Sequence, residues 1–403
     1  MSDSVNQFDL AEVQEALRET GVDGWLFAQF RGRDPIANRV LGLAEGGLQT
    51  RRWFYYVPAD GEPRGMVHAI EPNVLNSLPG EALRYMRWQE LQEGIGRLIG
   101  DAKRVAMQYA PNNHIPYVAL VDAGTVELVM ACGVEVVSSA EMMQRFTARL
   151  TDWQIASHHQ AAAQLPGIVK TAFGLVRERV TTGAKLTEYE VQQYILECFE
   201  KGGLVTDKPP IVGVNENSAD PHYIPAPEGS APIRRGDWLL IDLFAHTPDT
   251  HAVWADITWT AQVDSEIPDQ RAEIFHVVRR ARDASVTLIR DRYVSGSAVT
   301  GCEADCASRE VIEAAGYGSG IKHRTGHSIT DELHGTGACL DDLETHDFRR
   351  LIRRTCFSVE PGIYLDAFGV RSEVDVLIPP KGVPEVTGKQ QDAPILLLAP
   401  NGF

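Results

Sequence analysis

The sequence predicts two domains, an α/β domain at the N-terminus followed by an α+β domain. The chain has 403 residues, which is more than one domain usually contains. About the first 150 residues alternate helical and strand-like segments, a pattern typical of an α/β fold with a partly parallel sheet. From about Asp152 the pattern changes to long helices followed by groups of strands. We therefore expect the domains to span residues 1–152 and 153–403.

The N-terminal domain is expected to begin with a helix at residues 9–21. Leu10, Val13 and Leu17 recur there at helical spacing, with Asp9 as the N-cap and Gly21 as the stop. Apolar runs then indicate strands, and amphipathic runs indicate helices. The other expected elements are strands at 22–30, 66–70 and 104–110 and helices at 81–100 and 139–151.

The C-terminal domain is expected to begin with two long helices, at residues 154–180 and 186–202. Thr187 and Glu190 form a capping box at the start of the second helix. Strands follow, and then the order of helices and strands repeats, which suggests two similar halves. The strands expected first are 209–214, 237–245 and 251–261; the second round has helices 269–291 and 302–318 and strands 356–365 and 369–378.

Charge and composition exclude several classes of protein. The net charge is −17, with no run of Lys or Arg, which disfavours a nucleic-acid partner. No apolar stretch is long enough to span a membrane, and the acidic N-terminus does not resemble a signal peptide. The six cysteines lack paired CxxC motifs, so we expect buried free thiols in a reducing cytoplasm.

Four acidic residues interrupt apolar runs in the C-terminal domain: Asp242, Asp256, Glu360 and Glu373. An ionised carboxylate is costly to bury without a partner. A single case could be explained by a wet strand face or a nearby arginine. Four cases, together with the histidine-rich stretch KHRTGHSITDELHG at 322–335, favour a pair of divalent cations. Two such ions would neutralise the four carboxylates and leave a neutral imidazole as a further ligand.

This ligand set indicates hydrolytic chemistry. Oxygen ligands with a single nitrogen suit Mn²⁺, Fe²⁺, Co²⁺ or Zn²⁺. Two metals about 3.5–4 Å apart can share and acidify one water. His323 and His327 have the i, i+4 spacing of an HExxH zinc helix, but the Glu after the first His is missing and Gly326 weakens a helix. The acidic ligands must therefore come from elsewhere in the chain.

The order Asp, Asp, His, Glu, Glu resembles that of the pita-bread metallopeptidases, which include methionine aminopeptidase, aminopeptidase P, prolidase and the metal-free creatinase. Gly236 and Asp237 open the strand of the first acid, and the segments SVEPGIYL and GVRSEVDV are close to family motifs. An N-terminal α/β domain of this length is similar to that of the creatinase, prolidase and aminopeptidase P branch. The resemblance implies a pita-bread fold for the C-terminal domain.

The resemblance also implies a role for each ligand. Asp242 would chelate one metal, and Asp256 and Glu373 would bridge both. His327 and Glu360 would hold the second metal, and Glu360 would also shuttle the proton of the bridging hydroxide.

Four further residues match substrate-site positions of the family. His334 would bind substrate and steady the tetrahedral intermediate, while His323 and His222 would contact the substrate. Arg371 would lie in the substrate site near Glu373. For the three histidines, a plain surface position is the alternative. The histidines expected to be solvated are His158, His159, His246, His251 and His346.

The implied function is hydrolysis of the bond before proline, in dipeptides or at the N-terminus of short peptides, by a metal-bridging hydroxide. Mn²⁺ is expected ahead of Co²⁺, Zn²⁺ or Fe²⁺, and the protein is expected to be a cytoplasmic homodimer. Ser328-Ile329-Thr330 follow His327 where the family has Gly-Ile-Gly. Such departures leave open C–N or C–S cleavage of a small metabolite, or a non-catalytic binding protein on the same fold.

Overall fold

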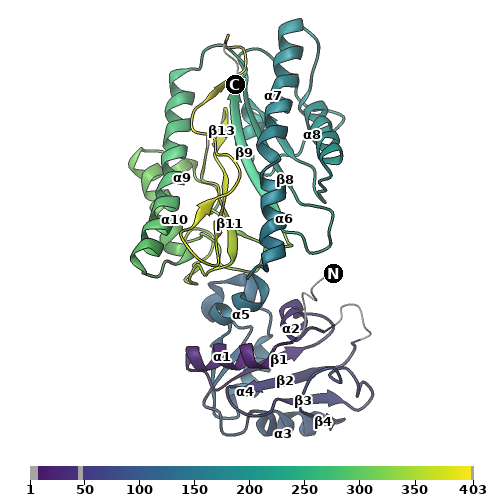
Figure 1. Ribbon diagram of the computed structural model, residues 1–403. Helices are drawn as coiled ribbons and strands as arrows, with labels where there is room; N and C mark the ends of the chain where they lie inside the picture. Colours follow the sequence, from purple (N-terminus) through teal and green to yellow (C-terminus); the bar gives the residue numbers. More distant parts are fainter. Residues whose placement is uncertain (1–7, 44–48, 401–403) are drawn as a thin grey trace. The chain divides into compact units, whose positions relative to one another are not determined.

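The computed structural model describes residues 8–43 and 49–400 and divides into two compact units, Met1–Thr147 and Ala148–Phe403 (Figure 1). The division lies five residues before the boundary expected at 152, which stays a prediction. Among the described residues, no helix is both long and apolar enough to cross a bilayer.

The first unit is built on a six-stranded sheet in the order β4-β3-β2-β1-β5-β6. β2 is antiparallel to its two neighbours, and the other neighbouring pairs are parallel. The carboxyl ends of β1, β3, β4, β5 and β6 therefore lie along the same edge of the sheet. The strands are β1 (Gly24–Gln29), β2 (Trp53–Pro58), β3 (Arg64–His68), β4 (Glu81–Tyr85), β5 (Arg104–Met107) and β6 (Glu135–Ser138).

Helices cover both faces of this sheet. Alternate residues of each strand point to opposite faces, so Trp25 and Phe27 lie in one apolar core and Leu26 lies in another. The first core includes residues of α1, α2 and α5, and the second includes residues of α3 and α4. The helices are α1 (Leu10–Thr20), α2 (Pro35–Leu41), α3 (Trp88–Ile99), α4 (Ala123–Met130) and α5 (Ala140–Thr147).

Helix α1 confirms its predicted caps. The Asp9 side chain accepts a hydrogen bond from the Glu12 N–H, and Gly21 adopts the left-handed conformation that ends the helix. The helix expected at 81–100 is wrong in its first part, because residues Glu81–Tyr85 form β4. This segment pairs in parallel with β3, and pairing with a neighbouring strand overrides local helix propensity.

The N-cap of α2 predicts a pH dependence of stability. Asp34 is buried, and burial raises its pKa to about 7. The folded state therefore binds a proton that the unfolded state has already released, and stability should fall as pH rises from about 4 through 7. A shift of about three pH units corresponds to at most about 4 kcal/mol.

Asp34→Asn should flatten this dependence, since the amide oxygen can still accept the hydrogen bond that Asp34 receives from the Ala37 N–H. Urea denaturation at pH 5 and pH 8 measures the effect. The control is Asp9→Asn at the exposed N-cap of α1. Equal pH dependence in the wild type and the Asp34 variant would contradict the prediction.

In the second unit, helix pairs lie on either side of the strands (Figure 1). Helices α7 and α8 share an apolar core with the sheet β16-β9-β8-β7. Helices α9 and α10 pack toward the sheet β10-β11-β14-β15 and the pair β12-β13. The helices are α6 (Asp152–Ala162), α7 (Leu165–Thr182), α8 (Glu188–Gly202), α9 (Asp269–Ser295) and α10 (Gly301–Ala314). The strands are β7 (Ile211–Val214), β8 (Trp238–Ala245), β9 (Ala255–Gln262), β10 (Ser328–Ile329), β11 (Thr355–Val359), β12 (Gly362–Tyr364), β13 (Gly369–Arg371), β14 (Val374–Ile378), β15 (Glu385–Val386) and β16 (Ile395–Leu396).

Three expected elements of this unit are divided in two. The helix expected at 154–180 breaks between α6 and α7, where Pro166 occupies the first turn of α7. The strand expected at 356–365 breaks between β11 and β12, and that at 369–378 breaks between β13 and β14. The sequence predicted that Glu360 and Glu373 lie within strands. In the structure, each of them lies instead at an interruption between two strands.

The cysteines are free thiols, as expected from their spacing. They are not all buried, however. Cys339 and Cys356 are buried, while Cys132 on the first unit is exposed.

Candidate metal centre

Two neighbouring strands place the first two acids side by side. Asp242 of β8 is opposite Thr258 of β9, and Asp256 is opposite Phe244. Asp256 precedes Thr258 by two residues, so Asp242 and Asp256 lie diagonally on the same face of the sheet. Both side chains are buried.

His327 approaches the same place from the other sheet. Its Nε2 atom lies 3.8 Å from Asp256 Oδ2 and 3.4 Å from Glu360 Oε1. Ser358 fixes both neighbours: its hydroxyl accepts a hydrogen bond from the His327 N–H at 2.9 Å and donates one to Glu360 Oε1 at 3.1 Å. The pairing of β10 with β11 brings these residues together, because Ser328 is opposite Phe357.

Glu373 completes the cluster. Its Oε2 atom accepts a hydrogen bond from the Thr258 hydroxyl at 2.6 Å. Asp256, His327 and Glu373 each offer one ligand atom, and these three atoms lie within 4.8 Å of one another. Arg371 joins Asp242 to this group, because it donates a hydrogen bond to Asp242 and its Nε atom lies 3.9 Å from Glu360 Oε2.

The cluster has buried oxygen atoms that no protein donor satisfies. Asp242 Oδ1, Asp256 Oδ1 and Glu373 Oε1 are buried without a hydrogen-bond partner among the described residues. A buried acceptor without a partner costs about 1–3 kcal/mol, and more when charged. Three such oxygens beside a histidine nitrogen fit a divalent cation of the hard or borderline type.

The electrostatics agree with this fit. Burial raises the pKa of Asp256 well above its ordinary value, and the charges of Glu373 and Asp242 raise it further. Burial lowers the pKa of His327 to about 3, so its imidazole is neutral at pH 7 and able to bind a metal. Burial also opposes ionisation of Glu360, but nearby positive charge, including that of the Arg371 guanidinium, outweighs it and leaves the pKa of Glu360 below its ordinary value.

Arg371 joins the cluster to His323 through Tyr364. The Arg371 guanidinium donates to Asp242 Oδ2, to Thr258 Oγ1 at 2.9 Å and to the Tyr364 hydroxyl at 3.2 Å. His323 Nε2 lies 2.6 Å from the same hydroxyl. Arg371 and His323 are thus beside the ligands, as expected, and their roles toward substrate stay predictions.

His334 and His222 are exposed side chains near the cluster. The His334 ring lies 4.2 Å from the His327 ring, measured between centroids. His222 follows the 3₁₀-helix Asn215–Ala219 and acts electrostatically on both Asp242 and His334. Their positions leave both histidines able to reach a ligand, and their assignment to substrate stays a prediction.

The expectation that His158 is solvated is wrong. The side chain is fully buried, with Nδ1 2.7 Å from the Trp254 carbonyl and Nε2 2.8 Å from Thr387 Oγ1. Its burial follows from its place on the inner face of α6. His158 Nε2 lies 4.0 Å from Asp375 Oδ2, which accepts a hydrogen bond from the Asp256 N–H at 2.8 Å.

The sequence analysis missed several residues that hold the candidate ligands in place. Thr258 and Asp375 each lie two residues after a ligand, and Ser358 lies two residues before one. Strand periodicity places such residues on the same face as the ligand, so a search at this spacing could have found them. Tyr364 lies four residues after Glu360 and carried no such signal.

A buried carboxylate organises the loop that holds His222. Glu188 Oε1 accepts hydrogen bonds from the Val214 N–H at 2.7 Å and the Asn217 amide at 3.0 Å, and Oε2 accepts from the Tyr223 hydroxyl at 2.7 Å and the Ala231 N–H at 2.9 Å. In Glu188→Gln an amide group must replace one of these acceptors. We expect destabilisation by about 2–3 kcal/mol in urea denaturation.

The control for this prediction is Glu190→Gln, at an exposed position two residues further along the same helix. Glutamine can take the place of glutamate in the capping box with Thr187, so this change should have little effect. Equal stability of the two variants would show that the Glu188 network contributes nothing.

Residues 157–380, more than half of the chain, match the model of metallopeptidase family M24. The chain belongs to metallopeptidase family M24. The matched segment contains all five candidate ligands. The family resemblance expected from the order of the acids is therefore confirmed.

Individual M24 relatives agree with this assignment. The chain is 28% identical over 224 residues to the Xaa-Pro dipeptidase of Lactobacillus delbrueckii subsp. lactis and 30% identical over 219 residues to that of Pyrococcus furiosus. These matches cover 55% and 53% of this chain, and the chain spans only 55% and 57% of the relatives' length.

Solved structures extend the likeness in fold to nearly the whole chain. The dipeptidase PepE of Mycobacterium ulcerans has a TM-score of 0.65 at 19% identity, over 97% of this chain and 100% of that one. The prolidase of Pyrococcus horikoshii has a TM-score of 0.57 at 19% identity, over 95% and 98%. The expected fold, an α/β domain followed by an α+β pita-bread domain, is confirmed.

Proposed function

We propose that this protein hydrolyses the peptide bond before proline, in Xaa-Pro dipeptides or at the N-terminus of short Xaa-Pro peptides, with two divalent metal ions. The observation that supports this most strongly is the group of unsatisfied carboxylate oxygens on Asp242, Asp256 and Glu373 beside the neutral His327. Relatives that are named Xaa-Pro dipeptidases support the choice of substrate.

The proposed ligands are Asp242 on one metal, Asp256 and Glu373 on both, and His327 with Glu360 on the other. Bound divalent cations would supply a nucleophile by acidifying water and would polarise the scissile carbonyl. The four acidic ligands can balance the charge of two such ions, with the histidine as a neutral ligand. We propose Mn²⁺ ahead of Co²⁺, Zn²⁺ or Fe²⁺.

Glu360 is the proposed proton carrier. Its lowered pKa keeps it ionised at neutral pH, and the Ser358 hydroxyl holds Oε1 in place. It can therefore accept a proton from water and later deliver that proton to the leaving amine. His334 is exposed beside His327 and can donate a hydrogen bond to charge that develops on the substrate oxygen.

Arg371 and His323 are proposed to shape the substrate site. The Tyr364 hydroxyl connects the two side chains, so each fixes the orientation of the other. His222 lies on the loop organised by Glu188 and is also proposed to contact the substrate. These residues would orient the peptide and perform no proton transfer.

The substrate assignment is tested by assaying the Mn²⁺-loaded protein against Ala-Pro, Ala-Pro-Ala and Ala-Ala-Ala. We expect cleavage only where proline follows the scissile bond. The ratio of the first two rates then distinguishes a dipeptidase from an aminopeptidase. Cleavage of Ala-Ala-Ala as fast as the proline peptides would contradict the proposed specificity.

We also propose that the protein is a homodimer of the cytoplasm, on the basis of its family. Light scattering coupled to gel filtration should give twice the chain mass of 44.4 kDa. A mass of one chain at micromolar concentration would contradict the dimer.

A further inference from the structure

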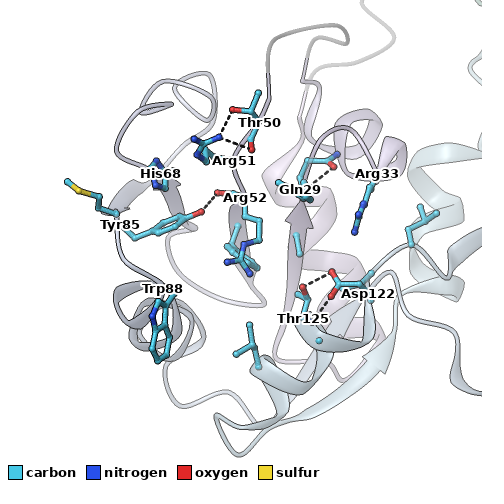
Figure 2. Close-up of a pocket in the computed structure, with 18 residues that line it drawn as sticks. Gln29, Arg33, Thr50, Arg51, Arg52, His68, Tyr85, Trp88, Asp122 and Thr125 are labelled. Carbon is cyan, nitrogen blue, oxygen red and sulfur yellow. Dashed lines mark hydrogen bonds between the residues drawn. The ribbon is translucent and has the colours of Figure 1, made fainter.

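The first unit contains a hollow at the edge of its sheet, built entirely from residues of that unit (Figure 2). Its volume is about 730 Å³, within the range of about 300–1,000 Å³ that small-molecule sites occupy. None of the proposed catalytic or metal-binding residues lines it. The hollow therefore shares no residue with the proposed metal and substrate site.

The hollow lies where the helices that follow two neighbouring parallel strands pack on opposite faces of the sheet. β1 and β5 are parallel neighbours, and both end at this edge. The helix after β1, α2, packs in the core on one face, whereas the helix after β5, α4, packs in the core on the other face. Parallel strands whose following helices diverge leave a crevice at their carboxyl ends, and this is where α/β sheets bind ligands.

The charge of the hollow is opposite to that of the whole chain. Three arginines line it, Arg33, Arg51 and Arg52, against a single carboxylate, Asp122. Asp122 is already engaged as the N-cap of α4, where it accepts hydrogen bonds from the Thr125 N–H and hydroxyl. In a chain of net charge −17, this excess of positive charge is a local exception that favours an anion.

Arg52 is the best placed of the three. Its side chain projects into the middle of the hollow, with Tyr85 and Trp88 on one side and Asp122 and Thr125 on the other (Figure 2). The Tyr85 hydroxyl donates a hydrogen bond to the Arg52 carbonyl at 2.7 Å, which fixes the start of the side chain. Arg51 turns toward Thr50 and donates hydrogen bonds to it.

Aromatic and apolar side chains form the wall beside Arg52. Phe30, Phe54 and Tyr85 line the hollow, and Trp88 and Met86 stand at its rim with 62% and 68% of their surface exposed. Large apolar side chains exposed next to arginines are typical of sites that bind a ligand with both a ring and a charge. A flat ring can stack on an aromatic face while its acidic group pairs with a guanidinium.

We propose that this hollow binds a small anion with a flat ring, whose acidic group pairs with Arg52 and whose ring packs against Tyr85 and Trp88. A nucleoside monophosphate and an aromatic carboxylate share this chemistry. Each of them carries one acidic group, which can pair with an arginine guanidinium, attached to a flat ring system small enough to fit the hollow.

The test is isothermal titration calorimetry of the full chain with adenosine monophosphate and, separately, with indole-3-acetate. The controls lack the charge or the ring: adenosine and inorganic phosphate for adenosine monophosphate, and indole and acetate for indole-3-acetate. We expect binding of at least one of the two ring-containing anions, and at least tenfold weaker binding of its controls. Adenosine monophosphate alone would identify a phosphate ligand, and indole-3-acetate alone a carboxylate ligand. Binding of neither would overturn the proposal.

Variants locate the site. Arg52→Ala and Trp88→Ala should each weaken binding by about tenfold or more, because each removes one of the two contacts. Arg84→Ala removes the same charge from an exposed position on β4 that does not line the hollow, and it should leave the affinity unchanged. Circular dichroism and thermal unfolding of each variant, compared with the wild type, check that it is folded. If the Arg52 and Arg84 variants lose affinity equally, the loss reflects only the net charge of the protein, and the proposed site is refuted.

Discussion

Replacing Glu360 with glutamine is expected to lower kcat for Xaa-Pro hydrolysis by about 10²–10⁴-fold, the range of a lost general acid–base catalyst. Glutamine keeps one oxygen that can accept the Ser358 hydrogen bond but cannot accept a proton from water. Metal content should be largely preserved, because the other four ligands are unchanged. The measurement pairs steady-state kinetics with metal analysis of the same sample.

The matched control is Glu385→Gln, a half-exposed acid on β15 that pairs with His159 away from the cluster. It should retain wild-type kcat. Full activity of the Glu360 variant would exclude its proton-carrying role. Loss of both activity and metal would instead make Glu360 chiefly a ligand.

Replacing Asp256 with asparagine is expected to abolish stabilisation of the protein by metal. In the wild type, a divalent cation at a hundredfold excess over its Kd should stabilise the folded state by about 2.7 kcal/mol per site. Asp256 is proposed to contact both ions, so its replacement should remove this gain and the activity together. Without metal, the variant should be at least as stable as the wild type, since one of the mutually repelling buried carboxylates is gone.

Thermal unfolding with and without Mn²⁺ measures both effects. The control is Asp264→Asn, which alters a surface acid paired with Arg235 just beyond the end of β9 and should leave the metal-dependent rise in Tm intact. A metal-dependent rise that survives in the Asp256 variant would contradict the proposed ligand set.

Two of the candidate ligands stand out in the sequence because each of them breaks a local rule. Asp242 and Asp256 place charge within otherwise apolar strands, and such conflicts are expected mainly at functional sites. The strand breaks at Glu360 and Glu373 were harder to predict. Pro361 is a local sign of the break at Glu360, but no residue signals the break at Glu373. The apolar runs on both sides hid a change of strand partner that only tertiary structure specifies.

The contacts around the ligands were harder to predict because they depend on register. Thr258 binds Glu373 across 115 positions, and Asp375 binds the backbone of Asp256 across 119. A spacing of two residues could mark Thr258 and Asp375 as neighbours of a candidate ligand, but no local pattern specifies the partner that each one binds. His158 illustrates the converse error: it was expected to be solvated, whereas tertiary packing buries it completely.

The hollow of the first unit was invisible to the sequence for a similar reason. Its arginines and aromatic residues lie at or near the ends of β1, β2 and β4 and at the start of α3, and none of them stands out when taken singly. Only the order of the strands, with β2 antiparallel to its neighbours, gathers them at one edge.

The most direct test of the central proposal is the number of metal ions bound per chain. The protein is stripped of metal with a chelator, reloaded with Mn²⁺ and desalted. Inductively coupled plasma mass spectrometry should then find two ions per chain, and the same sample should cleave Ala-Pro. Two ions without any peptide cleavage would keep the metal site and reject the substrate. A protein that retains no divalent metal would contradict the assignment of Asp242, Asp256, His327, Glu360 and Glu373 as ligands.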